Sequence, residues 1–310
     1  MLELEDACFV PSLTGNNSVS SEHPTMKIPK RLQPLLDDGL VDEVVSRLMS
    51  GKEADVYVVR CGTAIRCAKV YKDSMKRSFK HAVQYQEGRR VKSSRRARAM
   101  EKGSRYGRQQ QEDAWQTAEV DALYRLAAAG VRVPKPYGCT DGVLLMELVI
   151  DQDGDPAPRL AEVDLTAAEA LIDHGKMMHF IKLMLVAGVV HGDLSEFNVL
   201  VDEAGPVIID LPQAVDAAGN NNAEAMLARD VNNITGFYSL FAPELKETRY
   251  AKEMWSLYED GALRTDTRLT GAFKEDLQAA DVDGVLEEIN AAIDEENAKQ
   301  ARIREAETSS

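Results

Sequence analysis

The sequence lacks the features of a disulfide-rich, zinc-binding or membrane-spanning protein. Its four cysteines, at positions 8, 61, 67 and 139, form no Cys-x2-Cys pair and no regular framework, which argues against disulfides and structural zinc. No apolar run approaches the roughly 18 residues of a membrane span, and the first residues include acids where a signal peptide carries positive charge. We therefore expect a cytoplasmic location and no membrane partner.

Positive charge is also scarce. The chain has 37 Lys and Arg against 51 Asp and Glu, a net charge of -14. This balance disfavours a protein that coats nucleic acid, although it permits a local basic surface. With 310 residues, of which 44% are apolar and 28% charged, the chain can bury a core in one two-lobed domain or in two small domains.

The first 49 residues divide into two segments. Residues 1–25 are polar and show neither helical nor strand periodicity, so we expect a disordered extension. From 26 to 49 the apolar residues recur at helical spacing, which predicts an N-terminal helical segment of one or two short helices. Met26 opens this second composition, and the sequence leaves both Met1 and Met26 open as the start.

A glycine-containing turn between strands follows. Residues 50–53 form the turn, an alternating strand pattern covers 54–59, and a second β-like run covers 64–71. The backbone amides of such a turn can lie over phosphates, and Lys69 on the second strand can pair with phosphate oxygens. The turn is not a Walker A loop. Taken alone, Gly51 also fits an ordinary hairpin turn and Lys69 an exposed edge residue.

Residues 75–108 are strongly basic, with twelve Lys or Arg against two Glu. This charge content predicts a solvated flexible loop. The loop carries four serines that are candidates for autophosphorylation: Ser78, Ser93, Ser94 and Ser104. Alternatively, it supplies a contact for an anionic partner, RNA or the ribosome, that the acidic remainder of the chain does not offer.

A helix and a strand complete the amino-terminal half. The apolar spacing predicts a helix over 112–129 that carries Glu119. Glu119 is either an ordinary surface residue of an amphipathic helix or the ion-pair partner of Lys69, as in kinases. Residues 143–149 predict a buried strand that leads into a polar, proline-containing segment. This arrangement suits a hinge whose backbone binds adenine.

The stretch His191-Gly-Asp-Leu-Ser-Glu-Phe-Asn198 carries the main candidate for chemistry. Phosphoryl transfer needs a carboxylate to orient the incoming hydroxyl and oxygen ligands for Mg²⁺. The spacing Asp-x4-Asn matches a kinase catalytic loop, with Asp193 as base and Asn198 and Asp210 as metal ligands. Taken alone, the same loop also fits a capped turn.

Taken together, the motifs resemble those of RIO-type atypical serine/threonine protein kinases, in particular the RIO1 branch. The motifs are Ser50-Gly-Lys-Glu-Ala54, Ala68-Lys-Val-Tyr71, Trp115 with Glu119, Asp155-Pro-Ala-Pro158, His191 to Asn198, Ile209-Asp210 with Gln213, and Arg229-Asp230-Val-Asn-Asn-Ile234. The resemblance covers roughly residues 40–245. It implies an α+β, bilobal protein-kinase-like fold without a conventional activation segment.

The expected organisation follows from this resemblance. The segments are a disordered extension (1–25), a helical segment (26–49), a β-rich lobe with one main helix and the basic loop (50–149), a helical lobe (150–295) and a charged tail (296–310). The short N-terminal region argues against the RIO2 branch, which adds a winged helix.

The resemblance also implies a role for each site residue. The catalytic set is Asp193, Asp210, Lys69 and Glu119, and the metal ligands are Asn198 and Asp210. The ATP-binding set is Ser50, Gly51, Lys52, Glu53, Val56, Lys69, Met146, Glu147, Leu148 and Val149. Asp210 resembles a nucleophile that forms an aspartyl-phosphate as well as a ligand. His191 and Asp230 are structural supports, and the implied cofactors are ATP and Mg²⁺, with Mn²⁺ as the alternative ion.

Three positions depart from ordinary kinases. Pro212 lies two residues after Asp210. Because its φ is fixed and the loop has no Gly, we do not expect the metal loop to switch between an inward and an outward conformation. The triplet Ala242-Pro243-Glu244 imitates the end of an activation segment, but we interpret it as a helix start. Gly192 replaces the Arg that senses activation-loop phosphate, so control by phosphorylation there is not expected.

The predicted function is an ATP- and Mg²⁺-dependent serine/threonine protein kinase that phosphorylates itself. Two alternatives remain open. One is an ATPase switch that works through phosphorylation of Asp210, and the other is a nucleotide-gated RNA- or ribosome-binding module that uses residues 75–108. The sequence identifies neither a protein substrate nor an oligomeric state.

Overall fold

The computed structural model of the chain describes residues 28–72 and 118–273. These residues divide into two compact units. Unit 1 holds 28–72, 118–124 and 133–156, and unit 2 holds 125–132 and 157–273. The predicted extension 1–25, the basic loop 75–108, the end of the predicted helical lobe (274–295) and the predicted charged tail (296–310) lie outside the described residues.

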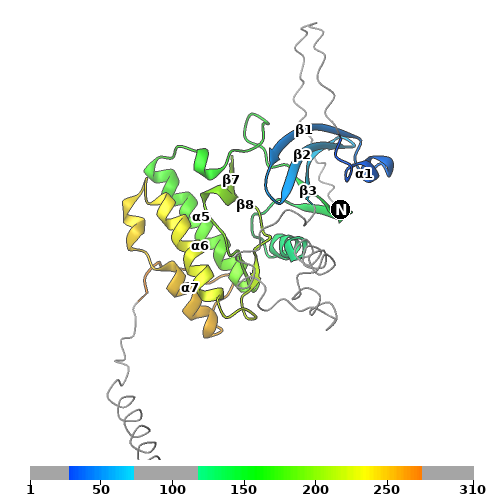
Figure 1. Cartoon of the computed structure of the whole chain (residues 1–310). Helices are drawn as coiled ribbons and strands as arrows, with labels where there is room; N and C mark the ends of the chain where they lie inside the picture. Colours follow the sequence, from blue (N-terminus) through cyan, green and yellow to red (C-terminus); the bar gives the residue numbers. More distant parts are fainter. Residues whose placement is uncertain (1–27, 73–117, 274–310) are drawn as a thin grey trace, which may run out of the picture. The chain divides into compact units, whose positions relative to one another are not determined.

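Unit 1 is built on a five-stranded antiparallel sheet with the order β1-β2-β3-β5-β4. The strands are β1 (Glu43–Ser50), β2 (Ala54–Cys61), β3 (Ala64–Tyr71), β4 (Pro136–Thr140) and β5 (Val143–Glu147). The β-branched and aromatic residues of β2 and β3 favour strands. A tight turn at Gly62, with φ of +63°, joins these two strands. β2, β3 and β5 therefore appear where the strand patterns predict them, and Figure 1 shows β1, β2 and β3 side by side.

One face of this sheet holds the apolar core of unit 1. The short helix α1 (Gln33–Asp37) begins with Pro34 in its first turn and contributes the buried Leu35. It lies beside the strands in Figure 1. The buried residues of the core are Leu32, Leu35, Val41, Tyr57, Val59, Ala68, Val70, Val143 and Leu145.

The prediction of a helical segment over 26–49 is wrong for its second half, because residues 43–50 form the edge strand β1. Val45 and Leu48 are 50% and 38% exposed, so their helical spacing does not mark a buried face. Pairing with β2 determines the conformation of residues 43–50 instead. The pairing begins with Glu43 opposite Arg60. Two register shifts interrupt the alternation of β1 and hide the strand period from the sequence.

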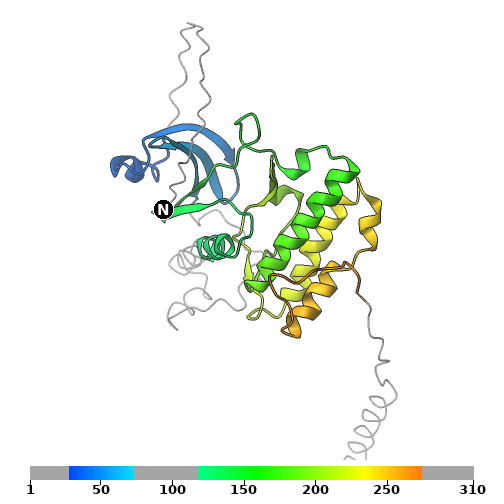
Figure 2. The same cartoon turned by 180° about the vertical axis from the view of Figure 1, so that it is seen from behind.

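Unit 2 is mainly helical. Its helices are α5 (Ala167–Val186), α6 (Ala223–Tyr238) and α7 (Tyr250–Glu259), with 3-10 turns η2 (Leu160–Glu162), η3 (Glu196–Asn198) and η4 (Pro243–Glu247). α5 (green), α6 (yellow) and α7 (orange) lie side by side in Figure 2. Thr166 and Glu169 form a capping box that fixes the start of α5. None of the helices in the described ranges is both long and apolar enough to span a membrane.

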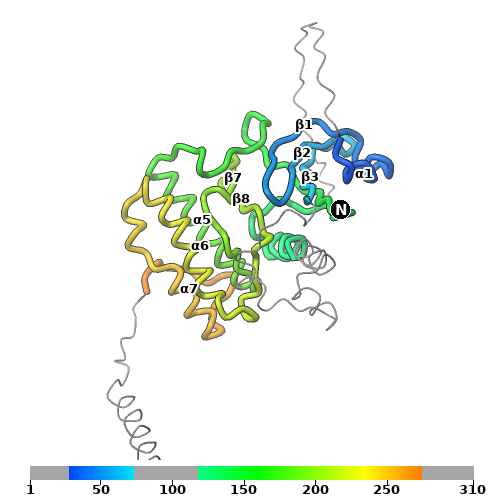
Figure 3. The backbone as a smooth tube through the Cα atoms, in the orientation of Figure 1, coloured from blue at the N-terminus to red at the C-terminus, as the bar shows by residue number. Residues whose placement is uncertain are grey.

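Two small antiparallel strand pairs complete unit 2. β6 (Val189–Val190) pairs with β9 (Val215–Asp216), and β7 (Val199–Asp202) pairs with β8 (Gly205–Ile208). Figure 3 shows β7 and β8 beside α5. The β7–β8 hairpin joins Asn198 to the residues before Asp210. The helix start predicted at Pro243 is confirmed, because this residue opens η4.

The predicted α+β class is confirmed, with a sheet in the amino-terminal region and helices in the carboxy-terminal part. Only residues 211–222 separate Asp210 from α6, and they hold β9 and turns. This stretch is too short for a long activation segment.

A buried histidine should make the stability of unit 2 depend on pH. His174 of α5 is 1% exposed and lies against Thr235, Tyr238 and Tyr250. Burial lowers the pKa of His174 from 6.5 to about 4. Between these values the unfolded state binds a proton that the folded state does not, so stability falls as the pH is lowered through this window.

The expected loss of unfolding free energy is on the order of 3 kcal/mol between about pH 7 and about pH 4. Urea unfolding of the wild type and of His174→Gln measures it, because the difference between the two proteins should shrink as the pH falls. The matched control is His179→Gln on the same helix, whose side chain is more exposed. A difference between wild type and His174→Gln that does not change with pH would contradict this prediction.

Candidate active site

In unit 1, Lys69 and Glu119 form a buried ion pair. The Lys69 ammonium lies 2.5 Å from Glu119 Oε1, and the two residues are 9% and 3% exposed. Residues 118–128 are helical, which matches the described part of the predicted helix. The structure thus brings together the two residues that the sequence pairs across fifty positions.

Tyr71 is a third member of this cluster. Its hydroxyl donates to Glu119 Oε2 at 2.6 Å, and its ring centre lies 5.7 Å from the Lys69 ammonium. Because strand residues two apart point to the same face, Lys69 and Tyr71 both reach the helix from β3. Both oxygens of the Glu119 carboxylate therefore have a hydrogen-bond donor, which satisfies a charge that is buried in unit 1.

The other residues predicted to bind ATP also lie in unit 1. Ser50 ends β1, and residues 51–53 form the turn before β2. Val56 of β2 is the register partner of Lys69. Met146 and Glu147 end β5, and Leu148 and Val149 follow. The turn, the Lys69 cluster and the end of β5 therefore belong to one sheet.

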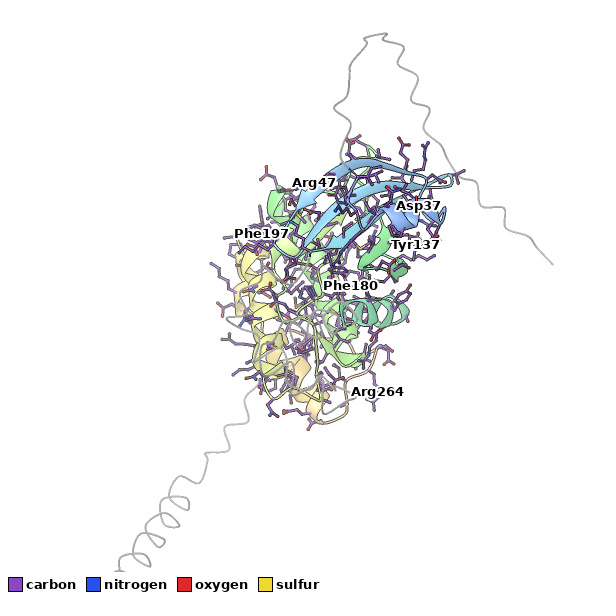
Figure 4. The ribbon with its side chains drawn as sticks, turned by 45° about the vertical axis from the view of Figure 1, so that its right-hand side comes forward. Asp37, Arg47, Tyr137, Phe180, Phe197 and Arg264 are labelled. Atoms are coloured by element: carbon purple, nitrogen blue, oxygen red, sulfur yellow. The ribbon has the colours of Figure 1, made fainter. Side chains whose placement is uncertain are left out.

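The predicted catalytic loop lies in unit 2, between β6 and β7. Asn198 Nδ2 donates to the backbone oxygen of Asp193 at 2.8 Å, which links the two ends of the motif. Gln213 Nε2 donates to Asp193 Oδ2 at 3.2 Å. Leu194 is buried, whereas Phe197, labelled in Figure 4, is 54% exposed. Polar contacts thus fix the Asp193 carboxylate in this loop.

His191 is held by both of its ring nitrogens. The Asp193 backbone N–H donates to His191 Nδ1 at 3.3 Å, so Nδ1 carries no proton. Nε2 then donates to the carbonyl oxygen of Ile209 at 3.1 Å. His191 is 1% exposed, and it joins the loop of Asp193 to the residue before Asp210. This geometry supports the structural role that the sequence predicts.

Helix α6 anchors the same loop with four hydrogen bonds from three residues. The buried Asp230 carboxylate accepts hydrogen bonds from the backbone N–H groups of Gly192 and Leu194, at 2.8 and 2.9 Å. Arg229 donates to the Gly192 carbonyl, and Asn233 Nδ2 donates to the Leu194 carbonyl at 3.0 Å. Donors and acceptors on both sides of Asp193 are thus satisfied from one helix, which supports the structural role that the resemblance implies for Asp230.

Asp210 follows β8 in a left-handed conformation, with φ of +66°. Such a conformation is uncommon for residues other than glycine, although Asp tolerates it better than most. The backbone N–H of the preceding Ile209 donates to the Asn198 carbonyl at 3.0 Å. The backbones that carry Asn198 and Asp210 therefore lie next to each other.

Asn198 and Asp210 offer oxygen atoms, the donor type that Mg²⁺ prefers. Because Asn198 Nδ2 is used by the Asp193 carbonyl, its Oδ1 remains the acceptor end of the amide. A hard cation bound by Asn198 Oδ1 and the Asp210 carboxylate fits this donor set, with water and phosphate oxygens as the remaining ligands.

Burial raises the pKa of the Asp193 carboxyl above its ordinary value. The neighbouring charge of Asp210 acts in the same direction, whereas Arg229 opposes the rise. A carboxylate with a raised pKa is a better proton acceptor than one with an ordinary pKa. The environment of Asp193 therefore suits a group that takes a proton from a hydroxyl.

The site list from the sequence omits four residues that the structure places in direct contact with it. They are Tyr71, Gln213, Arg229 and Asn233. All four stand in motifs that the sequence already singles out, without a role assigned to them: Ala68-Lys-Val-Tyr71, Ile209-Asp210 with Gln213, and Arg229-Asp230-Val-Asn-Asn-Ile234. The candidate phosphorylation sites Ser78, Ser93, Ser94 and Ser104 lie outside the described residues.

Comparisons with family models and with curated proteins point to the same family. The family described as RIO domain matches residues 55–251. The chain is 37% identical over 209 residues to "RIO-type serine/threonine-protein kinase Rio1" of Haloferax volcanii, which covers 66% of each chain.

Two eukaryotic relatives are also similar. "Serine/threonine-protein kinase rio1" of Schizosaccharomyces pombe is 30% identical over 210 residues, covering 67% of this chain and 40% of the relative. "Serine/threonine-protein kinase RIO1" of Homo sapiens is 31% identical over 210 residues, covering 66% of this chain and 34% of the relative. The chain thus spans less than two thirds of the length of these relatives.

Proposed function

Because the chain belongs to the RIO family, we propose that it is an ATP- and Mg²⁺-dependent serine/threonine protein kinase that also phosphorylates itself. The observation that carries the proposal is the Asp193 loop: Gln213 donates to the carboxylate, α6 holds the backbone on both sides of it, and Asn198 and Asp210 offer oxygen ligands. The names of the relatives support the same activity.

In the proposed reaction, a substrate hydroxyl oxygen forms a bond to the γ-phosphorus, and the bond from that phosphorus to the bridging oxygen of ADP breaks. Asp193 orients the hydroxyl and takes its proton, so it must be ionised beforehand. Lys69, held by Glu119 and Tyr71, pairs with phosphate oxygens. Gln213 donates to Asp193 Oδ2, so Oδ1 is the second oxygen of the carboxylate that can act as an acceptor.

The proposed cofactors are ATP and Mg²⁺, with Mn²⁺ as the alternative ion. Bound at Asn198 and Asp210, the ion would neutralise charge on the phosphates. The turn of residues 50–53 and the end of β5 supply backbone groups for the phosphates and the adenine, respectively.

The experiment that tests the function is incubation with γ-labelled ATP, with and without a protein substrate, followed by acid and hydroxylamine treatment. We expect an acid-stable label that hydroxylamine does not remove, as esters of Ser and Thr behave. A label that hydroxylamine removes would instead indicate an acyl phosphate on Asp210 and an ATPase-type switch. Phosphate release without any label would also contradict the kinase proposal.

The basic loop is part of the proposal as the chain's own substrate and as a contact for an anionic partner. A tethered segment reaches an effective concentration on the order of millimolar at a nearby site. Mass-spectrometric mapping of the labelled protein tests whether Ser78, Ser93, Ser94 and Ser104 accept phosphate. RNA or ribosome binding that depends on 75–108 tests the contact.

A reducing, cytoplasmic setting is the compartment that we propose for this activity. Within the described residues, Cys61, Cys67 and Cys139 are free thiols. Burial raises the pKa of Cys67 to about 12, so this thiol stays protonated and unreactive.

A further inference from the structure

The turn between β1 and β2 is held by a side chain to which neither the sequence motifs nor the proposed reaction gives a role. Lys72 directly follows β3, and its ammonium Nζ donates to the Gly51 carbonyl at 2.7 Å and to Ser50 Oγ at 3.1 Å. Its backbone N–H donates to the Glu53 carbonyl at 2.8 Å. One residue therefore contacts the beginning, the middle and the end of this turn.

Asp55 holds the ammonium in place. Its Oδ1 lies 3.0 Å from Lys72 Nζ and 3.4 Å from Arg47 Nη2; Arg47 is labelled on β1 in Figure 4. Burial alone would raise the pKa of Asp55, but hydrogen bonds from Ser50 and Lys72 and the charges of Lys72 and Arg47 hold it below its ordinary value. Asp55 is thus ionised at neutral pH and keeps the Lys72 ammonium beside the turn.

The hairpin does not need this clamp in order to form. β1 and β2 are paired from Glu43 to Ser50, and the Gly51 N–H donates to the Ala54 carbonyl at 2.9 Å. The Lys72 side chain is 36% exposed, and such ion pairs contribute little to the free energy of unfolding. The contacts instead restrict the conformations of the turn residues themselves, which are the ones assigned to the phosphates.

We propose that Lys72 is a positioning residue for the nucleotide phosphates, because it holds the turn of residues 50–53 in one conformation before ATP binds. This inference rests on the proposed function, in which the amides of that turn cover the phosphates. A turn that is ordered beforehand loses less conformational entropy on binding. Lys72 should therefore affect the binding of ligands that carry phosphates and not the binding of the nucleoside alone.

The test compares Lys72→Met with Arg60→Met. Arg60 lies on β2 at the other end of the same sheet, is 48% exposed in an ion pair with Glu43, and its replacement removes the same charge. Two quantities are measured: hydrogen exchange of the backbone amides of residues 50–54 without nucleotide, and the Kd values for Mg·ATP and for adenosine. Lys72→Met should exchange these amides several-fold faster and bind Mg·ATP roughly tenfold more weakly. Adenosine binding should stay within about twofold of the wild type, and Arg60→Met should match the wild type in every measurement.

Several results would overturn the inference. Unchanged exchange with weaker ATP binding would show that Lys72 acts directly on the phosphates and not through the turn. Faster exchange with unchanged ATP binding would show that the clamp has no part in positioning. Equal weakening of ATP and adenosine would indicate general damage to unit 1. A wild type that does not bind Mg·ATP would overturn the proposed function, and the exchange measurement would still report whether Lys72 orders the turn.

Discussion

Asp193→Asn should lower the rate of phosphoryl transfer by a factor on the order of 10² or more while leaving the fold intact. The substitution keeps the size of the side chain and an oxygen that accepts the hydrogen bond from Gln213. It removes the group that can take the hydroxyl proton. Asn198 contacts the backbone oxygen of residue 193 and not its side chain, so the loop should keep its conformation.

The rate is measured under single-turnover conditions with saturating Mg·ATP, and the Kd for Mg·ATP is measured separately. The Kd should change little, because Asp193 acts on the hydroxyl. Asp216→Asn is the matched control, since it removes the charge of an exposed carboxylate in unit 2 that pairs only loosely with Arg125, at 3.7 Å. Turnover of Asp193→Asn at the wild-type rate would contradict the role of Asp193 as base.

The raised pKa of Asp193 gives this prediction a pH dependence. Only the ionised carboxylate can accept the proton, so activity should be lost as the pH falls through the pKa of Asp193 in the folded protein. Because desolvation raises that pKa, the acidic limb of the kcat/KM profile should lie at a higher pH than for an Asp with an ordinary pKa. Gln213→Leu removes a hydrogen bond to the ionised form and should move the limb further upward.

The chemistry of this site is readable from the sequence because its residues are close together along the chain. Asp193, Asn198 and Asp210 lie within eighteen positions, joined by a short hairpin whose turn and strand signals are local. Lys69 and Glu119 are far apart along the chain, but each stands on an element with a local signal in the sequence: the β-like run of β3 and the helical spacing of 118–128. Local patterns suffice to place such residues on their elements.

The supporting contacts are not readable in this way, since they depend on how elements pack. Neither spacing nor composition tells that His191 donates to the Ile209 carbonyl, or that Asn233 and Arg229 reach the loop from α6. The helical prediction for the residues of β1 is wrong for the same reason. Their strand conformation comes from pairing with β2, and the irregular register leaves an apolar spacing like that of a helix.

Asp210→Asn should abolish the Mg²⁺ dependence of nucleotide binding more completely than Asn198→Ala. Both replacements remove an oxygen ligand or weaken it, but Asp210 carries the only formal charge of the pair, and charge dominates the binding of a hard cation. The backbone is not a confounding factor. Asp210 adopts a positive φ, and Asn tolerates that conformation about as well as Asp.

A matched control exists for this substitution. Among the described residues other than glycine, Asp141 is the one besides Asp210 with a positive φ, at 51°. Asp141→Asn therefore makes the same chemical change at the same backbone conformation, in the turn between β4 and β5. Titration of ATP binding with Mg²⁺ should show no effect of Asp141→Asn, a partial loss for Asn198→Ala and almost complete loss for Asp210→Asn. If Asp210→Asn keeps the Mg²⁺ dependence of the wild type, Asp210 is not the ligand, and the metal must be assigned to other residues.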